Sequence, residues 1–170
     1  MNSNTPCLSQ LVASGSIRCT MPPDAASLAP TIESAPAKDR IEGMLLGVAI
    51  GDSLGNTSES MLPAKRHTLY GEIRDYQINR HAHEAPFNFP SDDTQMTFWA
   101  LRSILAEDGV VPESIAQAFS RGHIYGIGSA VRAFLGAYKV GTPWYKSGPE
   151  KAGNGALMRV SPLILPALIS

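Results

Sequence analysis

Two adjacent carboxylates between two hydroxyls, Ser91-Asp92-Asp93-Thr94, are the residues of this 170-residue chain best suited to chemistry. Two carboxylates this close repel each other unless a proton or a cation lies between them. Oxygen ligands of this kind suit hard divalent cations such as Mg²⁺ or Mn²⁺. An apolar-periodic segment, residues 95–106, follows at once, so Ser91 or Asp92 is expected at a helix N-cap. Taken alone, the stretch is either a helix cap, which is the commoner case, or part of a metal site.

Further polar residues with chemical potential accompany glycines. Asp52 lies in the glycine-bounded segment 51–55, where it can orient a metal site or cap backbone amides, and Glu59 follows it. Two glycine pairs occur later, Gly126 with Gly128 and Gly153 with Gly155, the second around Asn154. Such turns expose backbone N–H groups with no side chain in the way, which suits a phosphate or a ribose. Most Gly-x-Gly pairs are only turns, so each pair alone carries little weight.

A helix over residues 40–55 is expected to position Asp52. Its apolar side chains recur at helical spacing, and a glycine stands at every fourth position from Gly43 to Gly55. Each glycine inside a helix costs about 1 kcal/mol relative to alanine. The glycine stripe therefore predicts the close approach of another helix or of a ligand.

Three later segments also have helical patterns, at residues 95–106, 111–122 and 128–141. In the first of them, Met96 and Trp99 are expected to face a core. A further segment, residues 156–169, begins as an apolar helix that Pro162 and Pro166 should kink or interrupt. No β-alternation of useful length is present. The chain is therefore predicted to be all-α, a multi-helix domain with long functional loops.

Composition narrows the class of protein. One domain is the default at this length, and residues 1–38, rich in Ser, Pro, Ala and Thr, are expected to form a flexible leader before a domain at 39–170. A net charge of -1 gives no electrostatic footprint for nucleic acid and no polybasic membrane patch. No stretch is long and apolar enough to span a bilayer. Cys7 and Cys19 imply neither a disulfide framework nor a thiolate metal site. A cytoplasmic location is expected.

The order of the motifs resembles the ADP-ribosylglycohydrolase family, whose members include the dinitrogenase-reductase-activating glycohydrolase. The matching pieces, within residues 40–166, are Gly47-x3-Gly51-Asp52-x2-Gly55-x3-Glu59, Ser91-Asp92-Asp93-Thr94-x-Met96, Gly126-x-Gly128 and Gly153-Asn154-Gly155-x2-Met158-Arg159-x2-Pro162. The resemblance implies an all-α fold with a binuclear Mg²⁺ or Mn²⁺ centre in a central cleft. It also implies hydrolysis of the N- or O-glycosidic bond that links ADP-ribose to a protein side chain or a related acceptor.

The motif match assigns roles to individual residues. It puts Ser91, Asp92 and Asp93 on metal-ligand positions and Glu59 on an acidic position near the metals, where Glu59 is a ligand or an acid/base. Glu59 and Asp92 are the catalytic candidates. The substrate-binding candidates are Asp92, Gly126, Gly128, Gly153, Asn154, Gly155 and Met158. Cleavage at ribose C1 builds positive charge on the sugar. The cations could orient the ribose hydroxyls and acidify a water molecule, whose proton Glu59 or Asp92 could take.

One part of the family pattern is absent from this chain. Relatives close the metal site with a later Asp-x-Asp-Thr-type motif, but the last Asp here is Asp108 and the last acidic residue is Glu150. The resemblance therefore implies a truncated domain, roughly its N-terminal half, with exposed apolar surface at residues 163–169. A second chain or the missing C-terminal half is then an expected partner.

Two functions remain open from the sequence. The first is the N-terminal part of an active hydrolase that acts on an ADP-ribosylated protein or a small ADP-ribose conjugate. The second is a non-catalytic fragment or degenerate relative that only binds ADP-ribose or serves as an interaction module. Little turnover is expected from the 170-residue chain alone, because only half of the metal site is present.

Overall fold

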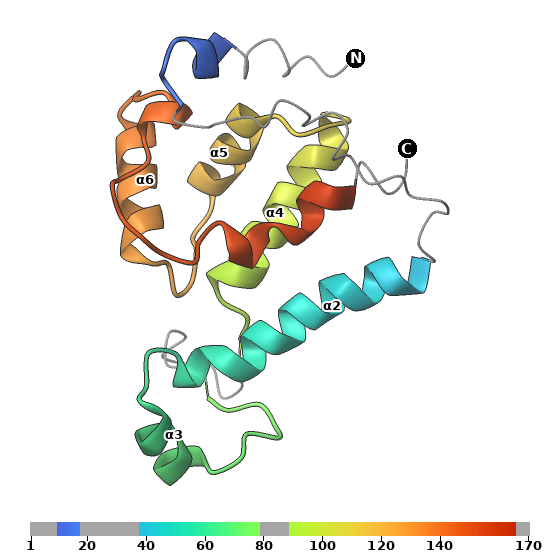
Figure 1. Cartoon of the computed structure of the whole chain (residues 1–170). Helices are drawn as coiled ribbons and strands as arrows, with labels where there is room; N and C mark the ends of the chain where they lie inside the picture. The colour runs from blue at the N-terminus through green and yellow to red at the C-terminus, as the bar shows by residue number, and fades with distance from the viewer. Residues whose placement is uncertain (1–9, 18–37, 79–88, 166–170) are drawn as a thin grey trace.

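The computed structural model describes residues 10–17, 38–78 and 89–165, and their regular structure is entirely helical (Figure 1). The elements in chain order are α2 (Lys38–Gly55), η1 (Asn56–Ser58), α3 (Pro63–Tyr70), α4 (Asp92–Ala106), α5 (Pro112–Arg121), α6 (Ser129–Lys139), η2 (Trp144–Lys146), η3 (Leu157–Arg159) and η4 (Ser161–Ile164). The described residues contain no strand, so the all-α prediction is confirmed. None of their helices has the length and the hydropathy that crossing a membrane requires.

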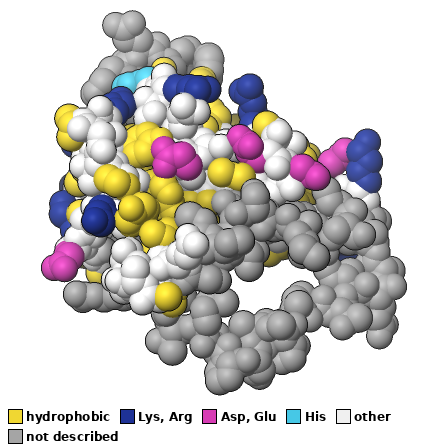
Figure 2. Space-filling view, turned by 90° about the horizontal axis from the view of Figure 1, so that it is seen from above, with side chains coloured by type: hydrophobic (Ala, Val, Ile, Leu, Met, Phe, Trp, Pro, Cys, Tyr) yellow, Lys and Arg dark blue, Asp and Glu magenta, His cyan; other side chains and the backbone are white. Residues whose placement is uncertain are grey.

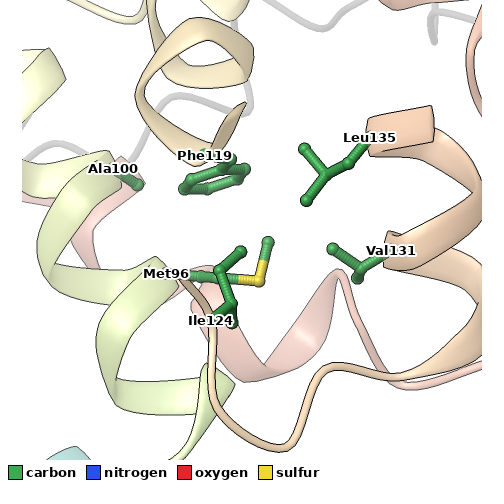
Figure 3. Packing of buried hydrophobic residues seen from close by; sticks show 6 residues of the cluster. All are labelled: Met96, Ala100, Phe119, Ile124, Val131 and Leu135. Atoms are coloured by element: carbon green, nitrogen blue, oxygen red, sulfur yellow. The ribbon is translucent and has the colours of Figure 1, made fainter. Parts of the chain in front are cut away.

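The hydrophobic core lies between α4, α5 and α6 (Figure 3). Its buried members are Met96, Ala100, Phe119, Ile124, Val131 and Leu135. Met96 and Ala100 are one turn apart on α4 and point toward Phe119 of α5 and toward the α6 side chains. Trp99 is partly buried and packs against the same cluster, so the predicted inward face of α4 is confirmed. This core holds the N-terminal end of α4 in a fixed place.

Local sequence signals explain the limits of α5 and α6. Pro112 begins α5, where its missing N–H costs nothing, and Glu113 complements the helix dipole in the first turn. Helix α6 ends at Lys139, two residues before Gly141, whose φ of 93° favours glycine. Both helices match the predicted segments to within three residues, because their start and stop signals are local.

Gly122 has a reason to be glycine other than its backbone angles. It is the C-cap residue of α5 but has an extended backbone, with φ −113° and ψ 169°. A Cβ added at Gly122 would lie 2.3 Å from Cη2 of Trp99. The large ring of Trp99 therefore packs directly on the Gly122 backbone, and this contact joins the end of α5 to α4.

No helix among the described residues packs against the glycine stripe of α2. Figure 1 shows α2 running below α4, and α2 contacts α4 and η1. A Cβ added at any stripe position from Gly43 to Gly55 would find no heavy atom within 4 Å. Leu46 and Ile50 are also exposed, at 59% and 46%. For the described residues, the predicted close approach of another helix was therefore wrong, because no other element lies over this face of α2, and the alternative of a ligand stays a prediction.

The segment predicted as an interrupted helix is broken from its start. Residues 157–164 form two 3₁₀ turns, η3 and η4, which pack on α4. In an α-helix the carbonyl of Met158 would accept a hydrogen bond from residue 162, but Pro162 has no N–H. The hydroxyl of Thr97 donates to this carbonyl instead, at 3.3 Å. The proline thus prevents an α-helix already at residue 158, earlier than the sequence analysis predicted.

Exposed apolar surface is present near the end of the described chain. Leu163 and Ile164 are 40% and 46% exposed, whereas Leu165 is buried. Figure 2 shows hydrophobic side chains gathered on the face seen from above, among scattered charged residues. The predicted exposure is therefore partly confirmed, and the rest of the predicted patch, residues 166–169, lies outside the described residues. Of the expected leader, the structure describes residues 10–17, where residues 10–13 form one helical turn.

Replacing Gly122 with alanine should lower the free energy of unfolding by about 1–3 kcal/mol, because the new Cβ must displace Trp99 from the core. Urea denaturation followed by Trp fluorescence measures this. The matched control is Gly136→Ala in the middle of α6, where an added Cβ meets open space. That change should stabilise the protein by up to about 1 kcal/mol. Equal effects of the two substitutions would contradict the proposed contact.

Candidate active site

The acidic quartet lies at the start of α4. Ser91 is the N-cap residue, with an extended backbone at φ −97° and ψ −156°, and Asp92 and Asp93 follow in the first turn. The predicted position of the cap is therefore confirmed. The side chain of Ser91 nevertheless makes no capping hydrogen bond to the helix.

Asp52 of α2 supplies the cap in its place. Its Oδ2 accepts hydrogen bonds from the backbone N–H of Ser91 at 2.7 Å and of Thr94 at 3.1 Å. The same oxygen accepts from the Thr94 hydroxyl at 2.6 Å, and Oδ1 accepts from the Ser91 hydroxyl at 2.6 Å. The negative charge of Asp52 also faces the positive end of the α4 dipole. Of the two roles considered for Asp52, the capping of backbone amides is the one that its hydrogen bonds show.

The carboxylates at this turn interact with one another electrostatically. Burial is the main reason why the pKa of Asp93 rises to about 6, and the charge of Asp92 is the next cause. The charges of Asp52 and Glu59 add smaller increases. Burial also raises the pKa of Asp92, although hydrogen bonds, including one from the Gly128 backbone, act in the opposite direction. The structure therefore brings Glu59, Asp92 and Asp93 within electrostatic reach of one another.

The first glycine pair lies beside these carboxylates. Gly128 is the N-cap residue of α6, and its backbone forms a hydrogen bond with the carboxylate of Asp92. Gly126 has a φ of 72°, in the left-handed region that favours glycine. The Oε1 of Gln95 accepts a 2.8 Å hydrogen bond from the N–H of Tyr125 and so ties this turn to α4. Sequence reasoning missed Gln95, although it is the unassigned position between the acidic quartet and Met96.

A cavity of about 500 Å³ adjoins α4, α5, α6 and the segment from Trp144 to Leu163. Its wall includes both glycines of the second pair, Gly153 and Gly155. Asn154, between them, is exposed. Met158 packs against the hydrophobic core. Most of the remaining wall is apolar, so the cavity suits a hydrophobic group.

Arg159 connects this cavity with the carboxylates. It lines the cavity, and its guanidinium lies 5.3 Å from the ring centre of Phe119, with Nη1 3.6 Å from Sδ of Met96. Burial lowers the pKa of Arg159, while the nearby charge of Asp92 opposes that shift. Arg159 forms no ion pair with any carboxylate in the described ranges. A half-buried guanidinium without an ion-pair partner is suited to an anionic ligand.

Asn56 is a supporting residue that sequence reasoning missed. Its side chain is 5% exposed, and Nδ2 donates to the carbonyl of Phe89 at 2.8 Å and to Oδ1 of Asp52 at 3.2 Å. It therefore holds both the capping carboxylate and the chain that enters α4. Its place four residues after Asp52, in the same helical register, was the available signal.

The donor atoms at this turn fit Mg²⁺ or Mn²⁺ in kind. The Ser91 hydroxyl and the carboxylates of Asp92, Asp93 and Glu59 are all hard oxygen donors. A cation would also relieve the repulsion that helps to raise the pKa of Asp93. In the part of the chain that the structure covers, no three His, Cys, Asp or Glu side chains are grouped closely enough to hold an ion. These residues therefore fit one side of a metal site.

Comparison with known proteins points to one family. The family model described as ADP-ribosylglycohydrolase matches residues 33–169. The chain is 29% identical over 152 residues to the ADP-ribosylarginine hydrolase Tri1 of Pseudomonas putida, a match that covers 80% of this chain and 38% of that protein. It is 31% identical over 134 residues to the ADP-ribosyl-[dinitrogen reductase] glycohydrolase of Rhodospirillum rubrum, covering 76% of this chain and 45% of that protein. The matched region therefore spans about two fifths of the length of these curated relatives.

Replacing Asp93 with asparagine should stabilise the metal-free protein at neutral pH. Because the pKa of Asp93 is about 6 in the folded state, against an ordinary 3.8, its charged form is disfavoured by folding. The free energy of unfolding therefore falls as the pH rises from about 4 to about 6, and the full deficit remains above that range. The shift corresponds to about 3 kcal/mol, which solvent screening of a half-exposed carboxyl reduces to about 1 kcal/mol.

Urea denaturation with a chelator present, at pH 7.5 and at pH 4, measures this difference. Asp93→Asn should be the more stable protein at pH 7.5 and should match the wild type at pH 4. Glu150→Gln, which changes an exposed loop carboxylate, is the control and should have no effect at either pH. A variant less stable than the wild type at pH 7.5 would show that the charged form of Asp93 is favoured by folding.

Proposed function

The chain belongs to the ADP-ribosylglycohydrolase family, and from this premise we propose that it forms one side of a metal-dependent active site for ADP-ribose hydrolysis. The bond cleaved is the glycosidic bond between ribose C1 and the side chain of an ADP-ribosylated protein. Arginine is the preferred acceptor in this proposal, since two of the matched relatives are named ADP-ribosylarginine hydrolases. The observation that carries the proposal is the electrostatic coupling of Glu59, Asp92 and Asp93 at the half-buried start of α4.

The proposed metal ligands are Ser91, Asp92, Asp93 and Glu59. When bound there, Mg²⁺, or Mn²⁺ in its place, would orient the ribose hydroxyls and make water more acidic. In the absence of such a charge, burial is the main cause that raises the pKa values of Asp92 and Asp93, and repulsion from the neighbouring carboxylates adds to it. This repulsion supports a site built for a cation over a simple helix cap, because Asp52 already supplies the cap.

The chain's own residues have two proposed catalytic tasks. Glu59 or Asp92 accepts the proton of the attacking water, and the raised pKa of Asp92 makes it a better base for this than an ordinary aspartate. The hydrogen bond from the Gly128 backbone keeps the Asp92 carboxylate oriented at the start of α6. The negative charge of the cluster also favours the positive charge that develops on the ribose ring during cleavage.

The cavity is the proposed site for the nucleotide part of the substrate. Its apolar wall, with Trp144 among the aromatic side chains, suits the adenine ring, and Arg159 suits the diphosphate. The backbone of the Gly153–Gly155 loop leaves room for a phosphate or a ribose to approach. Arg159 is also within electrostatic reach of Asp92, so one ligand can extend from the cavity to the carboxylates.

A further polypeptide segment is proposed to complete the metal site with additional carboxylates, whether it is continuous with this chain or belongs to a second chain. The matched relatives are more than twice as long as the region that they share with this chain. The uncovered glycine stripe of α2 offers that segment a surface for close packing. The isolated 170 residues should then show little turnover.

A second candidate function is a module that binds ADP-ribose without cleaving it. It is favoured by one observation: the described residues supply no group of three metal-ligating side chains that could hold an ion. Hydrolysis by the chain together with its completing segment, but not by either alone, would support the enzyme over the binding module.

Alanine at Asp92 or Asp93 should abolish the Mg²⁺-dependent part of ADP-ribose binding, because each change removes one proposed metal ligand. Isothermal titration calorimetry of ADP-ribose with and without Mg²⁺ measures this. Glu150→Ala, in an exposed loop, should bind as the wild type does. Unchanged binding in both aspartate variants would mean that the acidic pair is structural.

Alanine at Trp144 should weaken ADP-ribose binding by about tenfold, since stacking of a base on an aromatic side chain contributes about 1–3 kcal/mol. The matched control is Tyr76→Ala, which removes an exposed aromatic ring that is not part of the cavity wall. The same calorimetric titration measures both variants. An affinity that falls equally in both, or in neither, would exclude the cavity as the base site.

A further inference from the structure

We infer that Asp52 is the positioning residue of the proposed metal site, an inference that rests on the proposed function. Asp52 lies 39 residues before Ser91 and 42 before Thr94, on a different helix. Its two carboxylate oxygens accept four hydrogen bonds from these two residues. A fifth donor, Nδ2 of Asn56, holds Asp52 from its own side. The first turn of α4 is therefore fixed relative to α2 by one side chain.

This arrangement changes what Ser91 can do. Where Ser or Thr is the N-cap of a helix, its hydroxyl usually accepts a hydrogen bond from a backbone N–H of the first turn. Here Asp52 accepts the bond from the Thr94 N–H, and the Ser91 hydroxyl donates its own hydrogen to Asp52 at 2.6 Å. Because that hydrogen is committed, the Ser91 oxygen can only accept, which is the state that a metal ligand needs.

Asp52 also reduces the need for Asp92 and Asp93 to act as capping residues. Because Asp52 satisfies the Thr94 amide from α2, neither Asp92 nor Asp93 is needed to cap that amide, and Asp92 hydrogen-bonds its own backbone N–H. Both oxygens of Asp52 are occupied by protein donors, so Asp52 is neither a ligand nor a proton acceptor in this scheme. Apart from the effect of its charge, it acts on the cation through Ser91 and the first turn of α4. Such outer residues commonly change metal affinity by about 10–100-fold when mutated.

Asp52→Asn is the first test. The substitution replaces one accepting oxygen with an NH₂ donor that opposes the donors of Ser91 and Thr94. Titration of the metal-free chain with Mn²⁺, followed by electron paramagnetic resonance of the free ion, should show affinity reduced by about tenfold or more. Circular dichroism checks that the variant is folded. Asp52→Glu keeps the charge and both acceptors, and it should retain more affinity than Asp52→Asn does.

Thr94→Val is the second test and covers the case in which Asp52→Asn does not fold. It removes one 2.6 Å hydrogen bond to Asp52 and leaves every proposed ligand in place. The expected loss of Mn²⁺ affinity is smaller, about threefold. The control is Asp39→Asn, which removes an exposed acidic residue from the first turn of the same helix α2. Its Mn²⁺ affinity should equal that of the wild type.

The outcomes separate this inference from the function on which it rests. If the wild type binds Mn²⁺ no better than the Asp92→Ala variant does, the proposed metal site is wrong, and the role of Asp52 falls with it. If the wild type binds Mn²⁺, and folded Asp52→Asn and Thr94→Val bind it equally well, only the positioning role is overturned. Loss of affinity in Asp52→Asn and Thr94→Val but not in Asp39→Asn supports the role.

Discussion

The hydrogen bonds between the Asp52 carboxylate and the amino end of α4 join the two parts of the candidate site. On one side is α2, with Asn56 and then Glu59 following its end. On the other side is the acidic turn of α4, held by the core between α4, α5 and α6. Because this junction holds α2 against the start of α4, it keeps Glu59 within electrostatic reach of the acidic turn. An interaction between an anion and a helix amino end is strong enough for this task.

The same junction adds electrostatic repulsion between carboxylates, and other interactions in the fold must offset its unfavourable free energy. Asp52 adds a negative charge beside Asp93, whose pKa is already raised by burial and by Asp92. A sequence selected for stability alone would place a neutral side chain at the position of Asp93. Retaining several carboxylates in a partly buried place makes sense when a positive charge joins them during function. A cation bound during function would thus explain both the unfavourable grouping of carboxylates and the proposed chemistry.

The parts of the fold that sequence predicted are those set by local signals. Met96 and Trp99 gave the inward face of α4, and Pro112 gave the start of α5, because periodicity and capping act within a few residues. The capping of α4 by Asp52 could not be predicted, since it joins residues 39 or more positions apart. Pro162 causes the early break, but the replacement donor to the Met158 carbonyl, Thr97, lies 61 residues away and could not be predicted. The glycine stripe predicted a close partner that the described residues do not supply.

Arg159 sets how a ligand that fills both parts of the site would be arranged. The cavity is mainly apolar, and the start of α4 is acidic, so an anionic group is unfavourable beside the carboxylates. Arg159 links these regions, because its guanidinium packs against the ring of Phe119 and also interacts electrostatically with Asp92. A diphosphate is therefore most favourable at Arg159, with its base in the cavity and its sugar toward Asp92 and Glu59. ADP-ribose has its groups in this order along its length, with the bond that we propose is cleaved at the sugar end.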